Sequence, residues 1–119
     1  MEQMLLSEYL DALKAQGTSS RETICVVCPQ CQTVQNARDL IEAGAGKTFE
    51  DIEGFLGFSC VGRWTGAGSP KKDQKGGGCN WTLGGLFSCH TLEVITPDGE
   101  KNPRFRPATK EEAVIHNNQ

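Results

Sequence analysis

Two cysteines separated by two residues, Cys28 and Cys31, constrain the fold of this chain more than any other sequence feature. Two thiols at this spacing can bind one metal ion from a single turn, and structural zinc sites commonly combine such a pair with distant ligands. Cys60 and Cys79 are distant cysteines that complete a set of four. The sequence therefore predicts one structural zinc ion bound by Cys28, Cys31, Cys60 and Cys79, although four thiolates can also hold iron.

The composition is consistent with a fold that a metal ion stabilises. The chain has 119 residues, close to the common size of one domain, so we expect a single domain over residues 1–119. Only 37% of the residues are hydrophobic, and fourteen are glycine. A chain with so little apolar surface to bury gains stability from a metal ion that joins distant segments.

Cysteine usage and the first residues predict a soluble intracellular protein. Residues 1–6 lack the basic start of a signal peptide, and no apolar run is long enough to span a bilayer. In a reducing compartment, six cysteines favour metal binding or catalysis over disulfides. Composition alone leaves an oxidised, exported protein open.

Apolar periodicity predicts helices at the N-terminus and in the gap before Cys60. In the N-terminal segment 1–17, apolar residues at positions 6, 9, 10 and 13 predict a helix that Gly17 ends. Its apolar face either covers the core of the domain or docks on a partner. Helices over 36–43 and 48–56, the second capped by Thr48, are expected to fill the gap between the cysteine pair and Cys60.

The C-terminal end repeats the capping pattern. Thr109 is followed three residues later by Glu112, which predicts a short helix over 110–116. Residues 117–119 are then expected to be a disordered tail.

Strands are expected between these helices. We predict them over 23–27, 58–64, 79–83, 91–96 and 104–106, the last two joined by a turn at Pro97-Asp98-Gly99. The glycine- and lysine-rich stretch 66–78 is expected to be a flexible basic loop that joins two strands as a long hairpin. The predicted fold is α+β, with a small antiparallel, zinc-ribbon-like sheet and flanking helices held by the four-cysteine site.

Three further residues can compete for the metal. Cys25 lies on the strand expected before the cysteine pair, where its expected role is that of a buried thiol. Cys89 and His90 are alternative ligands that could replace one of the single cysteines.

The charge of this acidic chain is uneven. The net charge is -3, yet the segment from 60 to 90 is basic. A short basic segment is either a solvated surface or a phosphate-binding patch, and a nearby tryptophan can stack on a base. The candidate contacts to nucleic acid or to a partner are Arg63, Trp64, Lys71, Lys72 and Lys75.

Four sequence motifs carry a resemblance to a known group of proteins. They are the cysteine pair, Phe-Ser-Cys-Val-Gly-Arg at 58–63, Gly-Cys-Asn-Trp-Thr-Leu-Gly-Gly-Leu at 78–86, and the Pro-Asp-Gly turn at 97–99. Together they resemble an uncharacterised family of small cysteine-rich proteins encoded by bacteriophages and prophages. The resemblance covers nearly the whole chain and supplies no activity. It implies a phage gene product in the cytoplasm of a bacterial host, where small phage proteins often inhibit or redirect a host or defence protein.

Three functions from different classes follow. The first, which we favour, is a non-enzymatic zinc-binding interaction module, because a closed set of four thiolates leaves no position for a substrate. The second is a zinc-ribbon-like nucleic-acid binder that uses the basic loop. The third is a thiol-disulfide oxidoreductase, since a strand, Cys28-Pro29-Gln30-Cys31 and a helix would be similar to the glutaredoxin active site, with Cys28 as nucleophile. Neither membrane binding nor a particular oligomeric state is predicted.

Overall fold

The strands of the protein form two small sheets. The computed structural model describes residues 2–18, 20–69, 74–80 and 92–118. In the first sheet, β4 (Leu92–Ile95) lies between β1 (Glu2–Leu5) and β5 (Lys101–Pro103), parallel to β1 and antiparallel to β5. In the second sheet, β2 (Val26–Val27) lies between β3 (Val34–Gln35) and β6 (Arg106–Pro107), antiparallel to both. The predicted α+β class is confirmed, with the strands divided between two sheets.

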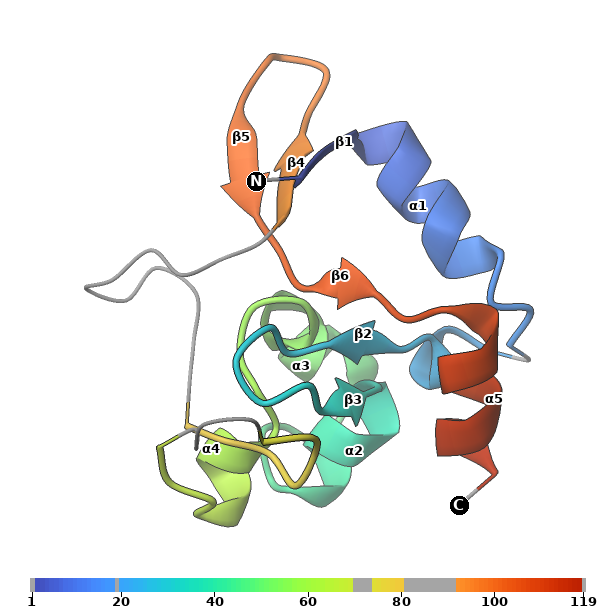
Figure 1. Cartoon of the computed structure of the whole chain (residues 1–119). Helices are drawn as coiled ribbons and strands as arrows, with labels where there is room; N and C mark the ends of the chain where they lie inside the picture. The colour runs from blue at the N-terminus through green and yellow to red at the C-terminus, as the bar shows by residue number, and fades with distance from the viewer. Residues whose placement is uncertain (1, 19, 70–73, 81–91, 119) are drawn as a thin grey trace.

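These sheets define two halves of the molecule (Figure 1). The hairpin half consists of β1, α1, β4 and β5, and the cysteine half consists of η1, β2, β3, β6 and α2 to α5. The segment that follows β5 passes from the hairpin half into the cysteine half and forms β6 there. The bounds of the helices are α1 Leu6–Lys14, η1 Arg21–Thr23 (a 3-10 turn), α2 Ala37–Glu42, α3 Phe49–Leu56, α4 Gly62–Thr65 and α5 Lys110–Asn117.

The predicted helix starts are confirmed where the sequence carries a capping residue. The amide of Asp51 donates to the Thr48 hydroxyl, 3.3 Å away, at the start of α3. The amide of Glu112 donates to the Thr109 hydroxyl, 3.1 Å away, at the start of α5. Such side chains satisfy backbone N–H groups that have no partner within the helix, so they fix where the helix begins.

The N-terminal segment is only partly helical. Residues 2–5, expected within the N-terminal helical segment, form the strand β1, whose partner β4 is about ninety residues further along the chain. The helix α1 follows and buries Tyr9 against Leu92 and Val94 of β4. Its apolar face thus covers a core of the protein, as one of the two predictions stated, although Leu10 remains 45% exposed.

Of two strands predicted around the first cysteines, one is shortened and the other is replaced by a helix. Residues 21–23 form a 3-10 turn, so the strand before the cysteine pair is reduced to Val26–Val27. The segment 58–64 was expected to be a strand and instead turns into α4, in which the amide of Arg63 donates to the Cys60 carbonyl. The loop that begins at Gly66 therefore leaves a helix and does not close a hairpin. Cys79 and Asn80 are outside any strand, and residues 81–83 lie outside the described residues.

Buried polar side chains join the two halves. Gln16, two residues after α1, is 1% exposed, and its side-chain amide donates to the carbonyls of Cys25 and Ala108. Its side-chain oxygen accepts from the Cys25 amide, 2.8 Å away. The Tyr9 hydroxyl donates to the Phe105 carbonyl, and the burial of this hydroxyl raises the pKa of Tyr9 to about 12. Both contacts hold the hairpin half against the segment that carries β6.

The C-terminal helix is longer than predicted. Asn117 belongs to α5, and its side-chain amide donates to the Thr23 carbonyl, so the prediction of a disordered tail from residue 117 is wrong at this position. The Asn117 side-chain oxygen also accepts from Asn36, the capping residue of α2. These contacts fasten the end of α5 to the rest of the cysteine half.

Candidate metal centre

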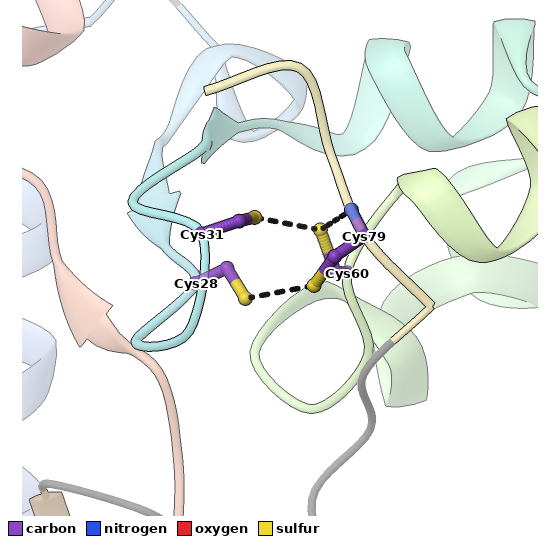
Figure 2. Close-up of side chains that lie close together, drawn as sticks. All are labelled: Cys28, Cys31, Cys60 and Cys79. Atoms are coloured by element: carbon purple, nitrogen blue, oxygen red, sulfur yellow. Dashed lines mark hydrogen bonds between the residues drawn. The ribbon is translucent and has the colours of Figure 1, made fainter. Parts of the chain in front are cut away.

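Four cysteine side chains from three separate segments meet in the cysteine half (Figure 2). Cys28 and Cys31 lie in the turn between β2 and β3, Cys60 precedes α4, and Cys79 follows the glycines at 76–78. All four are 0% exposed, and their sulfur atoms lie within 4.8 Å of one another. The structure thus brings together the four residues that the sequence predicts as ligands.

The spacing of the sulfur atoms matches a tetrahedral metal site. Cys28 Sγ lies 3.8 Å from Cys79 Sγ, and Cys31 Sγ lies 3.6 Å from Cys60 Sγ. A tetrahedron of thiolates at a zinc–sulfur distance of about 2.3 Å has edges of about 3.8 Å. A disulfide would need about 2.05 Å, so these are free thiols at the separation that one metal ion requires.

The turn that carries the first two cysteines is fixed by backbone hydrogen bonds. The Cys28 amide donates to the Thr33 carbonyl at 3.0 Å, and the Gln32 amide donates to the Cys28 carbonyl at 2.9 Å. To close this turn, Gln32 adopts a φ of +59°, which side chains other than glycine seldom take. The tight turn directs both sulfur atoms to one point. The strand β2 precedes the cysteine pair, but β3 and not a helix follows Cys31, so the helix expected after the pair of a glutaredoxin-like site is absent from this part of the described chain.

Hydrogen-bond donors surround the sulfur atoms. The Cys79 amide donates to Cys60 Sγ, 3.3 Å away. The Thr33 hydroxyl accepts from the Gly78 amide and lies 2.9 Å from Cys31 Sγ, so its proton can be donated to a thiolate there. Donors of this kind reduce the charge on metal-bound sulfur and orient the ligands.

The acidity of the thiols differs within the cluster. A hydrogen bond with Cys28 lowers the pKa of Cys60 to about 5, with help from the amides of Gly62 and Cys79 and against the effect of burial. The same interaction, together with burial, raises the pKa of Cys28. The environment of Cys60 therefore favours its thiolate, which is the form in which cysteine binds a metal. A nucleophilic Cys28 would instead need a lowered pKa.

Gln35, which the sequence does not mark as a site residue, holds the backbone on both sides of Cys60. It is 0% exposed on β3, and its side-chain amide donates to the carbonyls of Leu56 and Ser59 at 2.8 and 2.9 Å. Its side-chain oxygen accepts from the Val61 amide at 2.7 Å. A glutamine four residues after a cysteine carries no recognisable signal, because its partners lie more than twenty residues away along the chain.

Gly62 allows the close contact between α4 and the segment that carries Cys79. A β-carbon at position 62 would lie 2.2 Å from the Cys79 nitrogen and 2.5 Å from its carbonyl oxygen. Any larger residue would therefore displace the backbone of a candidate ligand.

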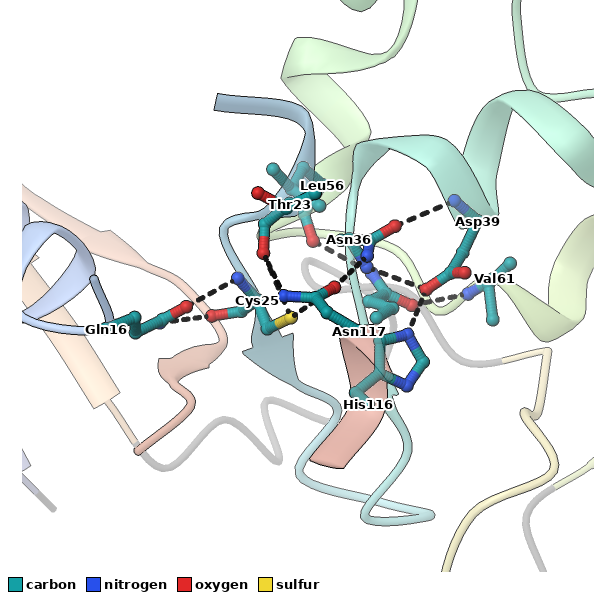
Figure 3. A network of polar contacts seen from close by, with 10 residues as sticks. Gln16, Thr23, Cys25, Asn36, Asp39, Leu56, Val61, His116 and Asn117 are labelled. Carbon is teal, nitrogen blue, oxygen red and sulfur yellow. Dashed lines mark hydrogen bonds and ion pairs between the residues drawn. The ribbon is translucent and has the colours of Figure 1, made fainter. Parts of the chain in front are cut away.

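Cys25 lies apart from the four-cysteine cluster. It is 0% exposed, and its thiol donates to the Thr23 carbonyl at 3.3 Å, close to Gln16 and Asn117 (Figure 3). Burial raises the pKa of Cys25 to about 11, so this thiol stays protonated at neutral pH. The prediction of a buried thiol is confirmed, and Cys25 lies outside the group of four close cysteines. Cys89 and His90, the other candidate ligands, lie outside the described residues.

The basic candidate contacts are only partly brought together. The Arg63 guanidinium lies over the Trp64 ring, 5.7 Å from its centroid, and Trp64 packs 5.1 Å from Phe55. Lys75 is exposed beside Gly76, whose amide donates to the Cys31 carbonyl. Lys71 and Lys72 lie outside the described residues. Acidic side chains of α3, among them Glu50 and Asp51, share this half of the protein with Arg63.

Comparison with known proteins gives one match. No curated protein and no solved structure matches the chain. In the part of the chain that the structure describes, no helix combines the length and apolar character needed to cross a membrane. The family model described as VVA0879-like matches residues 5–108, a span that includes all four cysteines of the cluster. The chain therefore belongs to the VVA0879-like family.

Proposed function

We propose that this protein is a non-enzymatic interaction module whose fold is held by one zinc ion bound to Cys28, Cys31, Cys60 and Cys79. The observation that carries the proposal is the set of four fully buried thiols at the separations of a tetrahedral site. Four protein ligands fill the coordination of zinc and leave no open position for water or substrate. A site of this kind stabilises structure and does not catalyse.

The position of the cluster supports a structural role. The four cysteines, with Val26 and Phe105, form one of the buried cores of the cysteine half. A metal ion there would link the β2–β3 turn to the segment before α4 and to the segment before Asn80. Structural zinc sites contribute binding free energies of about 10–16 kcal/mol in small peptides, comparable to the whole stability of a domain.

The interaction partner is proposed from the family resemblance of the sequence motifs. We take the protein to be encoded by a phage or prophage and to act in the cytoplasm of the bacterial host. Its partner is then a host or defence protein that it binds and modulates. Binding through a surface, with no chemistry, agrees with a buried metal site that no substrate can reach.

A nucleic-acid binder is the second candidate, favoured by the position of Arg63 over Trp64 and by the exposure of Lys75. Such a surface can combine phosphate contacts with base stacking. The acidic residues of α3 oppose it. Binding of single-stranded DNA that weakens steeply with added salt, and that Arg63→Ala reduces, would favour this function over protein binding.

Elemental mass spectrometry on protein purified without a histidine tag, combined with counts of free thiols, tests the metal-held fold. About one zinc per chain is expected, with the four cluster thiols protected until the protein is denatured. If the site held iron in place of zinc, the ion would still have a structural role, and only the identity of the metal would differ from the proposal. Cys28→Ser should lose the metal, whereas Cys25→Ser, a matched change of a buried thiol outside the cluster, should keep it. Protein without metal that forms a reversible Cys28–Cys31 disulfide would contradict the proposal in favour of a redox enzyme.

A further inference from the structure

We propose that an apolar groove on the hairpin half binds a segment of a partner protein that carries aliphatic side chains flanked by lysine or arginine. The groove lies where β1 runs into α1 and where β4 enters the turn before β5 (Figure 1). This inference rests on the proposed function of an interaction module and assigns a surface and a partner chemistry to it.

The groove is lined mainly by aliphatic side chains. It has a volume of about 320 Å³, and its apolar lining consists of Leu5, Leu6, Leu10, Ile95 and Pro97. Ser7 and Thr96 are its polar members. A groove of this size accepts one or two side chains, so it fits a short peptide segment better than the broad surface of a folded protein.

Two leucines of the groove are exposed, and the strand register accounts for the exposure of one of them. Leu5 is 54% exposed and Leu10 is 45% exposed. Leu5 pairs with Ile95 across the parallel strands, whereas the neighbouring pair of Met4 and Val94 packs with Tyr9. Because successive strand residues point to opposite faces, Leu5 and Ile95 lie on the face of the sheet away from this core. Exposed aliphatic side chains gathered in one place typically mark an interaction site.

The charges around the groove select the partner. On α1, in the turn after β4 and at the start of β5, exposed carboxylates outnumber exposed lysines. The carboxylates are Glu8, Asp11, Asp98 and Glu100, and the lysines are Lys14 and Lys101. A hydrogen bond from the Thr96 hydroxyl lowers the pKa of Asp98, which keeps that carboxylate ionised beside Pro97. An acidic rim repels a second copy of this acidic chain and attracts basic flanks on a partner segment.

A pair of synthetic peptides tests the proposal on the metal-loaded full chain. Both have a leucine–valine–leucine centre, flanked by lysines in one and by glutamates in the other. Calorimetric titration should show binding of the lysine-flanked peptide, weaker binding at high salt, and at least about tenfold weaker binding of the glutamate-flanked peptide. Methyl NMR signals of Leu5, Leu6 and Leu10 should shift on binding.

Matched variants locate the effect. Leu10→Ser should weaken binding of the lysine-flanked peptide about tenfold through lost apolar contact, and Val114→Ser, an equally exposed apolar residue on α5, should leave it within about twofold. Equal binding of both peptides, shifts confined to α5, or a concentration-dependent dimer with shifted Leu5 and Leu10 signals would each overturn the proposal. If the protein carries zinc and no peptide binds, the groove assignment alone fails. If the protein carries no zinc and cycles a Cys28–Cys31 disulfide, the proposed function itself fails.

Discussion

The core of the cysteine half differs from that of the hairpin half in the kind of residues that it buries. Four of the six buried residues in the main core of the cysteine half are the cluster cysteines. The hairpin half has Tyr9, Leu92 and Val94, which are ordinary apolar contacts. Thiolates around a metal ion are held together by metal–sulfur bonds, which contribute to the folding free energy. Three apolar side chains bury too little surface to stabilise a small sheet by themselves. If the cluster binds a metal ion as we propose, this difference predicts that the site supports both halves through the contacts that join them.

Removal of one ligand should have the largest effect. Cys60→Ser is expected to abolish metal binding and to cost more than about 5 kcal/mol of unfolding free energy, because metal binding at such a site is largely folding free energy. Hydrogen exchange should show lost protection in both halves. If the amides of β4 and β5 stayed protected in this variant, the hairpin half would fold independently, and the expectation that the metal site supports both halves would be wrong.

Gly62→Ala should disturb the proposed metal site without changing a ligand residue. The added β-carbon must push away the backbone of Cys79, so we expect at least about tenfold weaker metal affinity in a chelator competition. Gly54→Ala is the matched control, since no atom lies near that position in α3, and it should keep the affinity and add up to about 1 kcal/mol of stability. Unchanged affinity in Gly62→Ala would mean that the close contact with Cys79 is not needed.

Gln16→Leu separates the two halves. Three buried hydrogen bonds are lost and the Cys25 amide is left without this acceptor, so a cost of about 2–4 kcal/mol is expected. Zinc content should stay normal while amides of β4 and β5 lose protection in hydrogen exchange. Gln3→Leu, a change of an exposed glutamine on β1, should stay within about 0.5 kcal/mol. Zinc loss in Gln16→Leu would show that the hairpin half also supports the metal site.

The smallest effect concerns pH and remains within the cysteine half. His116 Nε2 lies 2.6 Å from an Asp39 carboxylate oxygen, and this hydrogen bond raises the pKa of His116 above its ordinary value of 6.5. A raised folded-state pKa stabilises the protein fully below the unfolded value, and this contribution is lost as the pH rises through the folded value. The free-energy difference between the wild type and His116→Gln, both zinc-loaded, should therefore be largest below about pH 6.5 and should shrink as the pH rises above that value. A constant difference would contradict the ion pair.

The sequence by itself determined the residues of the cluster and the starts of two helices. Both follow from the chemistry of residues that the sequence displays: a close cysteine pair with two distant cysteines is typical of a metal-binding cluster, and Thr48 and Thr109 satisfy amides only three residues away. The burial of the Cys25 thiol was also predicted correctly, although Cys25 lies just before the strand Val26–Val27 and not on it.

Only the tertiary structure decided how these parts meet. The pairing of β1 with β4 depends on residues far apart in the chain, so residues 2–5 gave no local sign of a strand. The close packing of Gly62 on the backbone of Cys79 joins segments that are distant in sequence, and Gln16 and Gln35 act through partners that no short-range pattern identifies. Buried hydrogen bonds and close backbone contacts are set by the three-dimensional position of their partners, and that position exists only once the chain has folded.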